Sequence, residues 1–196
     1  MFVGFTGNVP APTDANGTAT MAAQTAGEEA NATVQASTAD SESQASEARF
    51  TKEDALWLAR VIYSETKRPE EQELVAWVVR NRVETGYRGK RSIKDTVLDP
   101  YQFSAFNPQS RARKRYENLT PQHASSNWQR ALAIAYGVRG APDSLRPFPR
   151  KTRHFYSERS MVGRRHPDWA RGMKPVAPER TFALDERRFR FFEGVY

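Results

Sequence analysis

One segment of this chain is apolar around its whole circumference. Leu74–Val79 reads Leu-Val-Ala-Trp-Val-Val, with no polar residue at any position. Pro69 suits the first turn of a helix and Gly86 suits the position just past a helix end, so the flanks predict a helix over residues 70–84. A helix that is apolar on every side must be surrounded by other elements. We therefore expect this helix to be the buried centre of a domain.

The composition changes abruptly near residue 48. Residues 1–48 contain six acids, no Lys or Arg, and mostly Ala, Thr, Ser, Gln and Gly, too few large apolar side chains to offset chain entropy. We expect a disordered or extended acidic tail over 1–48 and one folded domain over 49–196. The domain holds 17 acids against all 30 Lys and Arg residues, a formal charge of +13. Such a charge predicts a polyanionic partner: nucleic acid, an acidic membrane surface or an anionic cell-wall polymer.

Other classes of protein find little support in the sequence. The chain has no cysteine and no apolar run long enough to cross a bilayer, so we expect neither disulfides nor a transmembrane segment. Its first ten residues lack the basic start and apolar stretch of a signal peptide, so unaided export is not expected. The three histidines are far apart, and no cofactor motif is present, so neither a metal nor a cofactor is expected.

Caps and periodicity predict three more helices and a small β region. The helices are 51–65, opened by a Thr51–Asp54 capping box, 92–98, opened by Ser92 and Asp95, and 121–139. Residues 101–106 are expected to be extended and to lead into a basic loop through residue 115. Residues 152–157 resemble a strand, and 181–193 resemble a hairpin that turns at Asp185-Glu186. Helices first and strands later predict a mainly helical α+β domain.

Glu65 continues the apolar face of the first helix. Ala55, Leu58, Ala59 and Ile62 recur at helical spacing, and the next position on that face is this carboxyl group. Burial disfavours the charged form of a carboxyl group and raises its pKa, which suits it to donate a proton near neutral pH. The alternative is a solvent-facing residue at a fraying helix end.

Seven short segments are more informative together, in their order and spacing along the chain, than any one of them alone. They are Leu58–Glu65, Val75–Val83 with its Asn-Arg-Val end, Asp95-Thr-Val97, Gln102-Phe-Ser104, His154-Phe-Tyr156, Pro167-Asp-Trp169 and the aromatic Arg188–Phe192. Together they resemble the catalytic domain of the SleB-type cell-wall hydrolases, a family named for spore-cortex-lytic enzymes and also found in bacteriophages. The flank differs, because the family follows its glutamate with Ala-Arg-Gly-Glu and this chain has Thr66-Lys-Arg-Pro69.

The resemblance implies a lysozyme-like core and cleavage of peptidoglycan between N-acetylmuramic acid and N-acetylglucosamine. Many members resemble lytic transglycosylases, which leave a 1,6-anhydro product. Glu65 is then the single catalytic acid and base. A hydrolytic mechanism needs a second acid, for which Asp95 is the candidate, followed by Asp99 and Glu84. Each of the three also has a structural explanation, as a cap, a turn residue or a solvated helix end, so we predict the single-acid mechanism.

The same resemblance favours substrate-binding roles for five residues: Gln102, Ser104, His154, Tyr156 and Trp169. Amide, hydroxyl and aromatic groups suit a sugar, which has polar edges and apolar faces. The alternatives are an ordinary edge strand for the first pair, a core position for Tyr156 and a packing role for Trp169.

A non-enzymatic basic virion structural protein or nucleic-acid-binding protein is the alternative function, motivated by the runs Arg111–Arg115, Arg150–Arg153 and Arg164-Arg165. No nucleic-acid signature accompanies these runs, so we favour a cell-wall partner and no specific nucleic acid. The expected partners are bacterial peptidoglycan and, through the tail, phage virion or tail proteins. The expected location is the virion, or the host cytoplasm before the protein acts on the wall.

Overall fold

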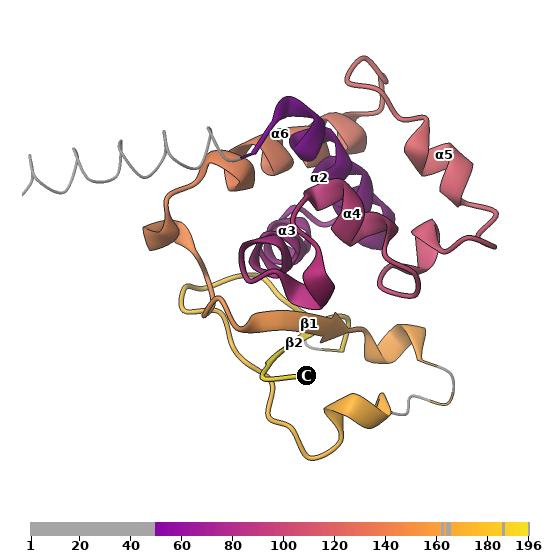
Figure 1. Cartoon of the computed structure of the whole chain (residues 1–196). Helices are drawn as coiled ribbons and strands as arrows, with labels where there is room; N and C mark the ends of the chain where they lie inside the picture. Colours follow the sequence, from indigo (N-terminus) through magenta and orange to yellow (C-terminus); the bar gives the residue numbers. More distant parts are fainter. Residues whose placement is uncertain (1–49, 162, 164–165, 186, 196) are drawn as a thin grey trace, which may run out of the picture. The chain divides into compact units, whose positions relative to one another are not determined.

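The computed structural model describes residues 50–161, 163, 166–185 and 187–195 of the chain (Figure 1). The tail expected over residues 1–48 lies outside the described residues. The described α-helices and strands are α2 (Lys52–Glu65), α3 (Pro69–Glu84), α4 (Ile93–Leu98), α5 (Arg113–Glu117), α6 (Ser126–Gly140), β1 (Thr152–Tyr156) and β2 (Arg190–Glu193). Short 3-10 turns are η1 (Tyr87–Gly89), η2 (Ser104–Phe106), η3 (Asp143–Leu145), η4 (Glu158–Ser160) and η6 (Asp168–Ala170). Many helical residues and one small sheet give an α+β fold, as the sequence predicts.

Helix α3 is the centre of the domain, as its sequence predicts. None of the side chains of Leu74–Val79 is more than 1% exposed. Helices α2, α4 and α6 and strand β1 all pack against α3, with the helices on one side and the strand on the other (Figure 1). Burying a large apolar side chain contributes roughly 1.5–3 kcal/mol relative to leaving it exposed, so this segment is the main apolar anchor of the fold.

The local signals at helix ends are confirmed. The backbone N–H of Thr51 donates to the Asp54 carboxylate at 2.9 Å, and the N–H of Asp54 donates to the Thr51 hydroxyl at 3.1 Å, which completes the capping box. Ser92 caps α4 by accepting from the N–H of Asp95 at 3.0 Å. Gly86 follows α3 with a φ of 61°, a conformation that suits glycine.

The prediction for residues 101–115 is partly wrong. The segment after α4 is a turn followed by η2 instead of an extended segment, and the basic loop ends at Ala112, because α5 begins at Arg113. The buried ring of Tyr116 contacts the rings of Tyr63 and Phe106, with centroids 6.2 and 6.1 Å away. That one apolar anchor folds a segment whose sequence is otherwise charged.

Helix α6 begins at Ser126, five residues later than predicted from Pro121. The backbone carbonyls before it accept hydrogen bonds from side chains of the helix instead of from its backbone. The Trp128 indole donates to Thr120 at 2.8 Å, and the Gln129 amide donates to Pro121 and His123, both at 2.7 Å. These side-chain bonds hold residues 120–123 in a turn.

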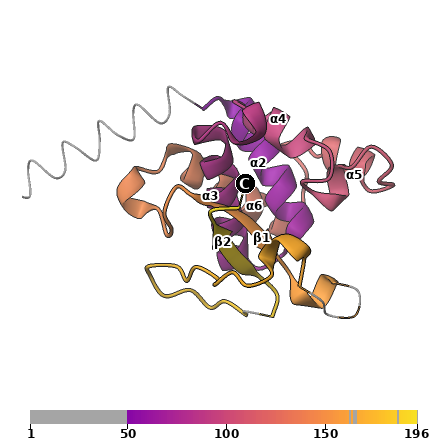
Figure 2. The same ribbon diagram turned by 60° about the horizontal axis from the view of Figure 1, so that its bottom comes forward.

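The prediction of a C-terminal hairpin is also wrong. The described part of residues 181–193 holds one strand, β2, which pairs antiparallel with β1 so that His154 lies opposite Phe192. Residue 186, half of the expected turn, lies outside the described residues. The strand pair lies against the helices (Figures 1 and 2). Asn81 of α3 helps to hold it by donating to the carbonyl of Thr152 at 2.8 Å.

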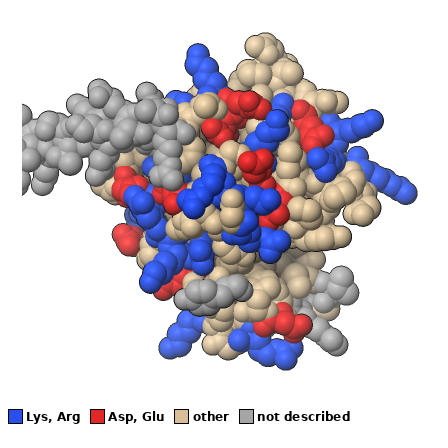
Figure 3. All heavy atoms as spheres, in the orientation of Figure 1, with Lys and Arg blue, Asp and Glu red and all other residues tan. Residues whose placement is uncertain are grey.

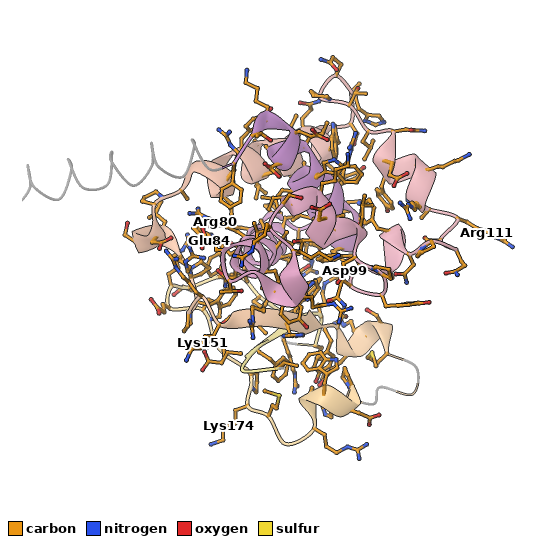
Figure 4. All side chains as sticks on the ribbon, in the orientation of Figure 1. Arg80, Glu84, Asp99, Arg111, Lys151 and Lys174 are labelled. Carbon is orange, nitrogen blue, oxygen red and sulfur yellow. The ribbon has the colours of Figure 1, made fainter. Side chains whose placement is uncertain are left out.

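A buried ionic network lies at the C-terminal end of α3. Arg80 and Glu84 point toward one another in Figure 4, with 2.7 Å between nitrogen and oxygen. Arg146 reaches the same carboxylate at 2.7 Å. Burial opposes ionisation of Glu84, but the two guanidinium groups hold its pKa below the ordinary value. None of the described helices combines the length with the apolar character needed to cross a membrane.

Candidate active site

A cleft of about 420 Å³ opens at the C-terminal end of α2. Its lining residues are Glu65, Arg82, Tyr101, Gln102, Ser104, Phe155, Tyr156, Ser157, Arg159, Ser160, Met161, Arg188 and Phe189. They come from α2, α3, the turn after α4, η2, the end of β1, the η4 segment and the residues that precede β2. The cleft therefore brings together Glu65, Gln102, Ser104 and Tyr156 among the residues singled out from the sequence.

Glu65 is the last residue of α2 and is half-buried at the wall of the cleft. Burial raises the pKa of its carboxyl group to about 7, although the positive charge of Arg82 opposes the rise. The partial negative charge at a helix C-terminus also disfavours the ionised form there. No described residue forms a hydrogen bond or ion pair with this carboxyl group. The group is thus desolvated, as the sequence predicts, and open to a ligand in the cleft.

Arg82 of α3 supplies a fixed positive charge beside Glu65. Its side chain is buried, and its Nε donates to the carbonyl of Arg153 at 2.7 Å. Its Nη1 is buried without a hydrogen-bond partner among the described residues. Burial lowers its pKa to about 10, while Tyr87 and Glu65 act in the opposite direction. The guanidinium is therefore still charged at neutral pH, and its charge acts on Glu65 from a buried position.

The turn after Glu65 is held by two buried residues of α3. The Thr66 hydroxyl donates to the Glu71 carboxylate at 2.5 Å, and the Gln72 amide donates to the Thr66 carbonyl at 2.8 Å. The other oxygen of Glu71 accepts from Nε of Arg188 at 2.9 Å. Glu71 thus joins the turn that follows Glu65 to Arg188, another residue of the cleft lining.

Two neighbouring acids of α3 bind residues of the segment that leads to Arg188. Glu73 forms an ion pair with Arg180, and Glu70 accepts a hydrogen bond from the backbone N–H of Ala183. Acids at the N-terminus of a helix also complement its dipole. In this fold they attach the segment 180–188, which has no secondary structure of its own in its described part, to the central helix.

His154 and Trp169 lie outside the lining of the cleft. Nε2 of His154 hydrogen-bonds the hydroxyl of Tyr87 at 2.8 Å, and its ring is covered by Trp169 with centroids 5.3 Å apart. Burial, with Arg82 and Arg153 nearby, lowers the pKa of His154 to about 4, so it is neutral at physiological pH. Both residues belong to an aromatic cluster with Tyr156, whose ring centroid lies 5.8 Å from that of Trp169.

Tyr156 lines the cleft, but its polar end is already bonded. Its hydroxyl pairs with Nδ1 of His166, and its ring stacks on Phe192 with centroids 5.5 Å apart. Burial, first among several influences, raises the pKa of this phenol. The contact available to a ligand is therefore a limited part of the ring.

The candidates for a second acid do not line the cleft. Asp95 is exposed, and its carboxylate accepts from the hydroxyl of Ser92 at 2.8 Å. Asp99 is buried and pairs with Arg88 at 2.6 Å. Glu84 belongs to the buried ionic network at the C-terminal end of α3. Asp95 therefore supports the cap of α4 and Asp99 lies in the turn before Pro100, as predicted, whereas the solvated helix end predicted for Glu84 is wrong, because its side chain is only 2% exposed.

Sequence reasoning missed Arg82, Tyr101, Glu71 and Arg188 as residues of the site or its support. Arg82 could have been predicted, because a charged residue in a helix that is otherwise apolar and buried is costly unless it has a function or a partner. The described residues contain no group of three or more His, Cys, Asp or Glu placed to hold a metal ion.

Comparisons of the chain with models of protein families, with curated proteins and with solved structures found no match. The functional interpretation accordingly rests on the residues of the cleft and on their geometry.

Proposed function

We propose that this protein cleaves the glycan strands of bacterial peptidoglycan between N-acetylmuramic acid and N-acetylglucosamine, as a lytic transglycosylase in phage-type wall degradation. The observation that carries the proposal is the state of Glu65, a carboxyl group with a pKa of about 7 at the wall of an open cleft. A general acid works best when its pKa lies near the working pH, so this group is suited to proton donation to a glycosidic oxygen.

The proposed reaction uses Glu65 twice. Protonated Glu65 gives its proton to the bridging oxygen, and the C1–O bond breaks with its electron pair staying on the departing N-acetylglucosamine. The carboxylate then takes the proton of the 6-hydroxyl of the muramic acid while that oxygen bonds to C1 and closes the 1,6-anhydro ring. Arg82 stabilises the carboxylate between the two steps, and Glu65 ends protonated as it began.

The single-acid route is supported by the composition of the cleft. Among the described residues of its lining, Glu65 alone carries a carboxyl group. A hydrolytic glycosidase places a second carboxylate across the sugar to activate water or to attack C1. Ring closure by the substrate's own hydroxyl needs neither, which is why we favour the anhydro product.

An anionic substrate is supported by the arginines of the cleft. Arg82, Arg159 and Arg188 line it, and two of them face carboxylates, Arg159 at 2.8 Å from Asp185 and Arg188 at 2.9 Å from Glu71. Arg82 has no carboxylate within ion-pair distance among the described residues, so its charge is available to the ligand. Peptidoglycan strands carry carboxylates on their peptide stems, whereas chitin carries none.

The test is mass spectrometry of purified peptidoglycan digested by the parent protein and by Glu65→Gln. We expect anhydro-muropeptides from the parent and a rate lower by roughly a hundredfold to ten-thousandfold for the variant, the range that a general acid contributes. Asp95→Asn is the matched control and should digest at the parental rate, because Asp95 lies outside the cleft. Reducing ends instead of anhydro ends would indicate a hydrolase, and equal rates for Glu65→Gln would refute the proposal.

The alternative function, a nucleic-acid-binding or virion structural protein, draws on the basic surface. Lys and Arg side chains cover much of the face in Figure 3, and Arg111 points away from the body of the molecule in Figure 4. Phosphate contacts of this kind weaken steeply with salt and are not sequence-specific. This alternative would be favoured if the protein binds DNA in a salt-sensitive way and neither the parent nor Glu65→Gln digests peptidoglycan.

A further inference from the structure

The turn after α4 holds a tyrosine in a conformation that suits glycine. The backbone N–H of Gln102 donates to the carbonyl of Asp99 at 3.2 Å, so residues 99–102 form a β-turn with Pro100 second and Tyr101 third. Tyr101 has a φ of +64°. A positive φ at the third position is typical of a type II turn, which glycine adopts without steric cost and tyrosine does not. Stability alone therefore favours glycine at this position.

The turn is rigid. The N–H of Tyr101 donates to the side-chain oxygen of Asn107 at 2.8 Å. On one side, Asp99 is buried and paired with Arg88, and on the other side Phe103 is only 2% exposed. The backbone of Tyr101 is thus fixed from both directions, so its side chain leaves the surface in a defined direction.

The fold makes little use of the Tyr101 ring. It is 77% exposed, and within the described residues its side chain has no hydrogen bond, ion pair or ring contact. Arg88 is the other described non-glycine residue with a positive φ, and its side chain forms the ion pair with Asp99 at 2.6 Å. The side chain of Arg88 therefore forms a contact that offsets its backbone strain, whereas the side chain of Tyr101 forms no such contact among the described residues.

The ring lines the cleft that contains Glu65, together with Gln102 and Ser104. A rigid, exposed aromatic ring beside an amide and a hydroxyl matches a pyranose, whose C–H faces are apolar and whose edges are polar. We propose that Tyr101 is a sugar-stacking platform: its ring binds the apolar face of an N-acetylhexosamine unit of the strand that passes Glu65. The identity of the sugar rests on the proposed function, while the platform rests on the turn and the exposed ring.

This role separates stability from binding, so both are measured on the full chain. Tyr101→Gly removes the strain and the ring, and Tyr101→Asn removes the ring while tolerating a positive φ. We expect each variant to melt higher, by about 2–4 °C for glycine. We expect each to bind the β-1,4-linked tetramer of N-acetylglucosamine about tenfold more weakly by calorimetric titration. On soluble peptidoglycan strands KM should rise while kcat changes little, because an interaction equal in ground and transition states is lost.

Two control variants accompany the test. Tyr101→Phe keeps the ring face and should keep the affinity for the tetramer. Leu145→Ala removes another exposed apolar side chain, 54% exposed and outside the cleft lining, and should change neither quantity. Unchanged affinity in Tyr101→Gly overturns the platform, as does absence of tetramer binding by the parent. A fall in both melting temperature and affinity also overturns it, because the ring would then belong to the fold.

The tetramer assay does not depend on catalysis by Glu65. If Glu65→Gln digests peptidoglycan as fast as the parent, the proposed reaction fails, and the tetramer titration still decides whether Tyr101 binds sugar. If Tyr101→Gly binds the tetramer normally while Glu65→Gln is inactive, the reaction stands without the platform.

Discussion

At the scale of single residues, Glu65 ties activity to pH. Its pKa rises from 4.5 to about 7 because burial disfavours the carboxylate. The proton donor is therefore the dominant form below pH 7 and is lost above it. We expect the rate of peptidoglycan cleavage to fall as pH rises through about 7, measured as turbidity loss of a wall suspension at constant ionic strength. A rate that keeps rising to pH 9 would contradict a protonated Glu65.

The same shift makes a prediction about stability. A carboxyl group with a raised pKa in the folded state favours the fold at low pH, and this contribution is lost between pH 4.5 and 7. The full shift corresponds to roughly 3 kcal/mol. Glu65→Gln should therefore match the parent in urea unfolding at pH 4.5 and exceed it by about 1–3 kcal/mol at pH 8. Glu193→Gln, at an exposed site on β2, should show no such pH-dependent gain; a constant offset for Glu65→Gln would contradict the desolvation.

The sequence predicted some residues of the site better than others. Glu65 could be predicted because the apolar periodicity of a helix is a local pattern in the sequence. Gln102 lies in the cleft lining although its segment is a turn, not the predicted extended segment. His154 and Tyr156 share a strand face as predicted, yet only the second reaches the cleft, at the end of β1. Tyr101 could not be found, because nothing in the letter sequence marks a tyrosine with a positive φ.

At the scale of elements, the first turn of α3 joins two segments of the chain that border the cleft. Glu71 has no exposed surface and bonds Thr66 and Arg188. Removing one partner of a buried ion pair leaves the other poorly solvated. We expect Glu71→Gln to cost roughly 2–4 kcal/mol in urea unfolding and to lower kcat, since the turn after Glu65 loses its anchor.

Glu73→Gln is the matched control for that prediction. Glu73 lies on the same helix and pairs with Arg180, but both side chains are partly exposed. Such a pair contributes about 0–1 kcal/mol, so this variant should unfold and digest nearly as the parent does. Equal effects of the two substitutions would show that Glu71 acts only as one more charge at the helix end.

The elements that were predicted well from the sequence are those with start or stop signals in their own residues. Helices α2, α3 and α4 have capping residues or a proline at their starts, and their bounds agree with prediction within a residue or so. The prediction failed for β2 because this strand pairs with β1, which is far away in the sequence, and no turn signal encodes such a pairing. Helix α5 failed because its only buried side chain is Tyr116, among four charged residues.

At the scale of the whole molecule, charge is divided between the tail and the domain. The full chain carries +7, but residues 1–48 hold six acids and no Lys or Arg, so the remainder carries +13. The described lining of the cleft comes from residues 65–189, and the ion pair that supports it joins Glu71 and Arg188. Deleting residues 1–48 should therefore leave digestion of purified peptidoglycan intact.

The deletion should also change how the protein meets its substrate. A more basic protein is attracted more strongly to an anionic wall, and salt screens this attraction over about 10 Å at 0.1 M. We expect the shortened chain to stay bound to wall fragments at higher salt than the full chain in a sedimentation assay. If the tail is a virion tether, the shortened chain is also lost from phage particles while its wall digestion persists. Equal incorporation would refute the tether, and lost digestion would show that the tail belongs to the catalytic unit.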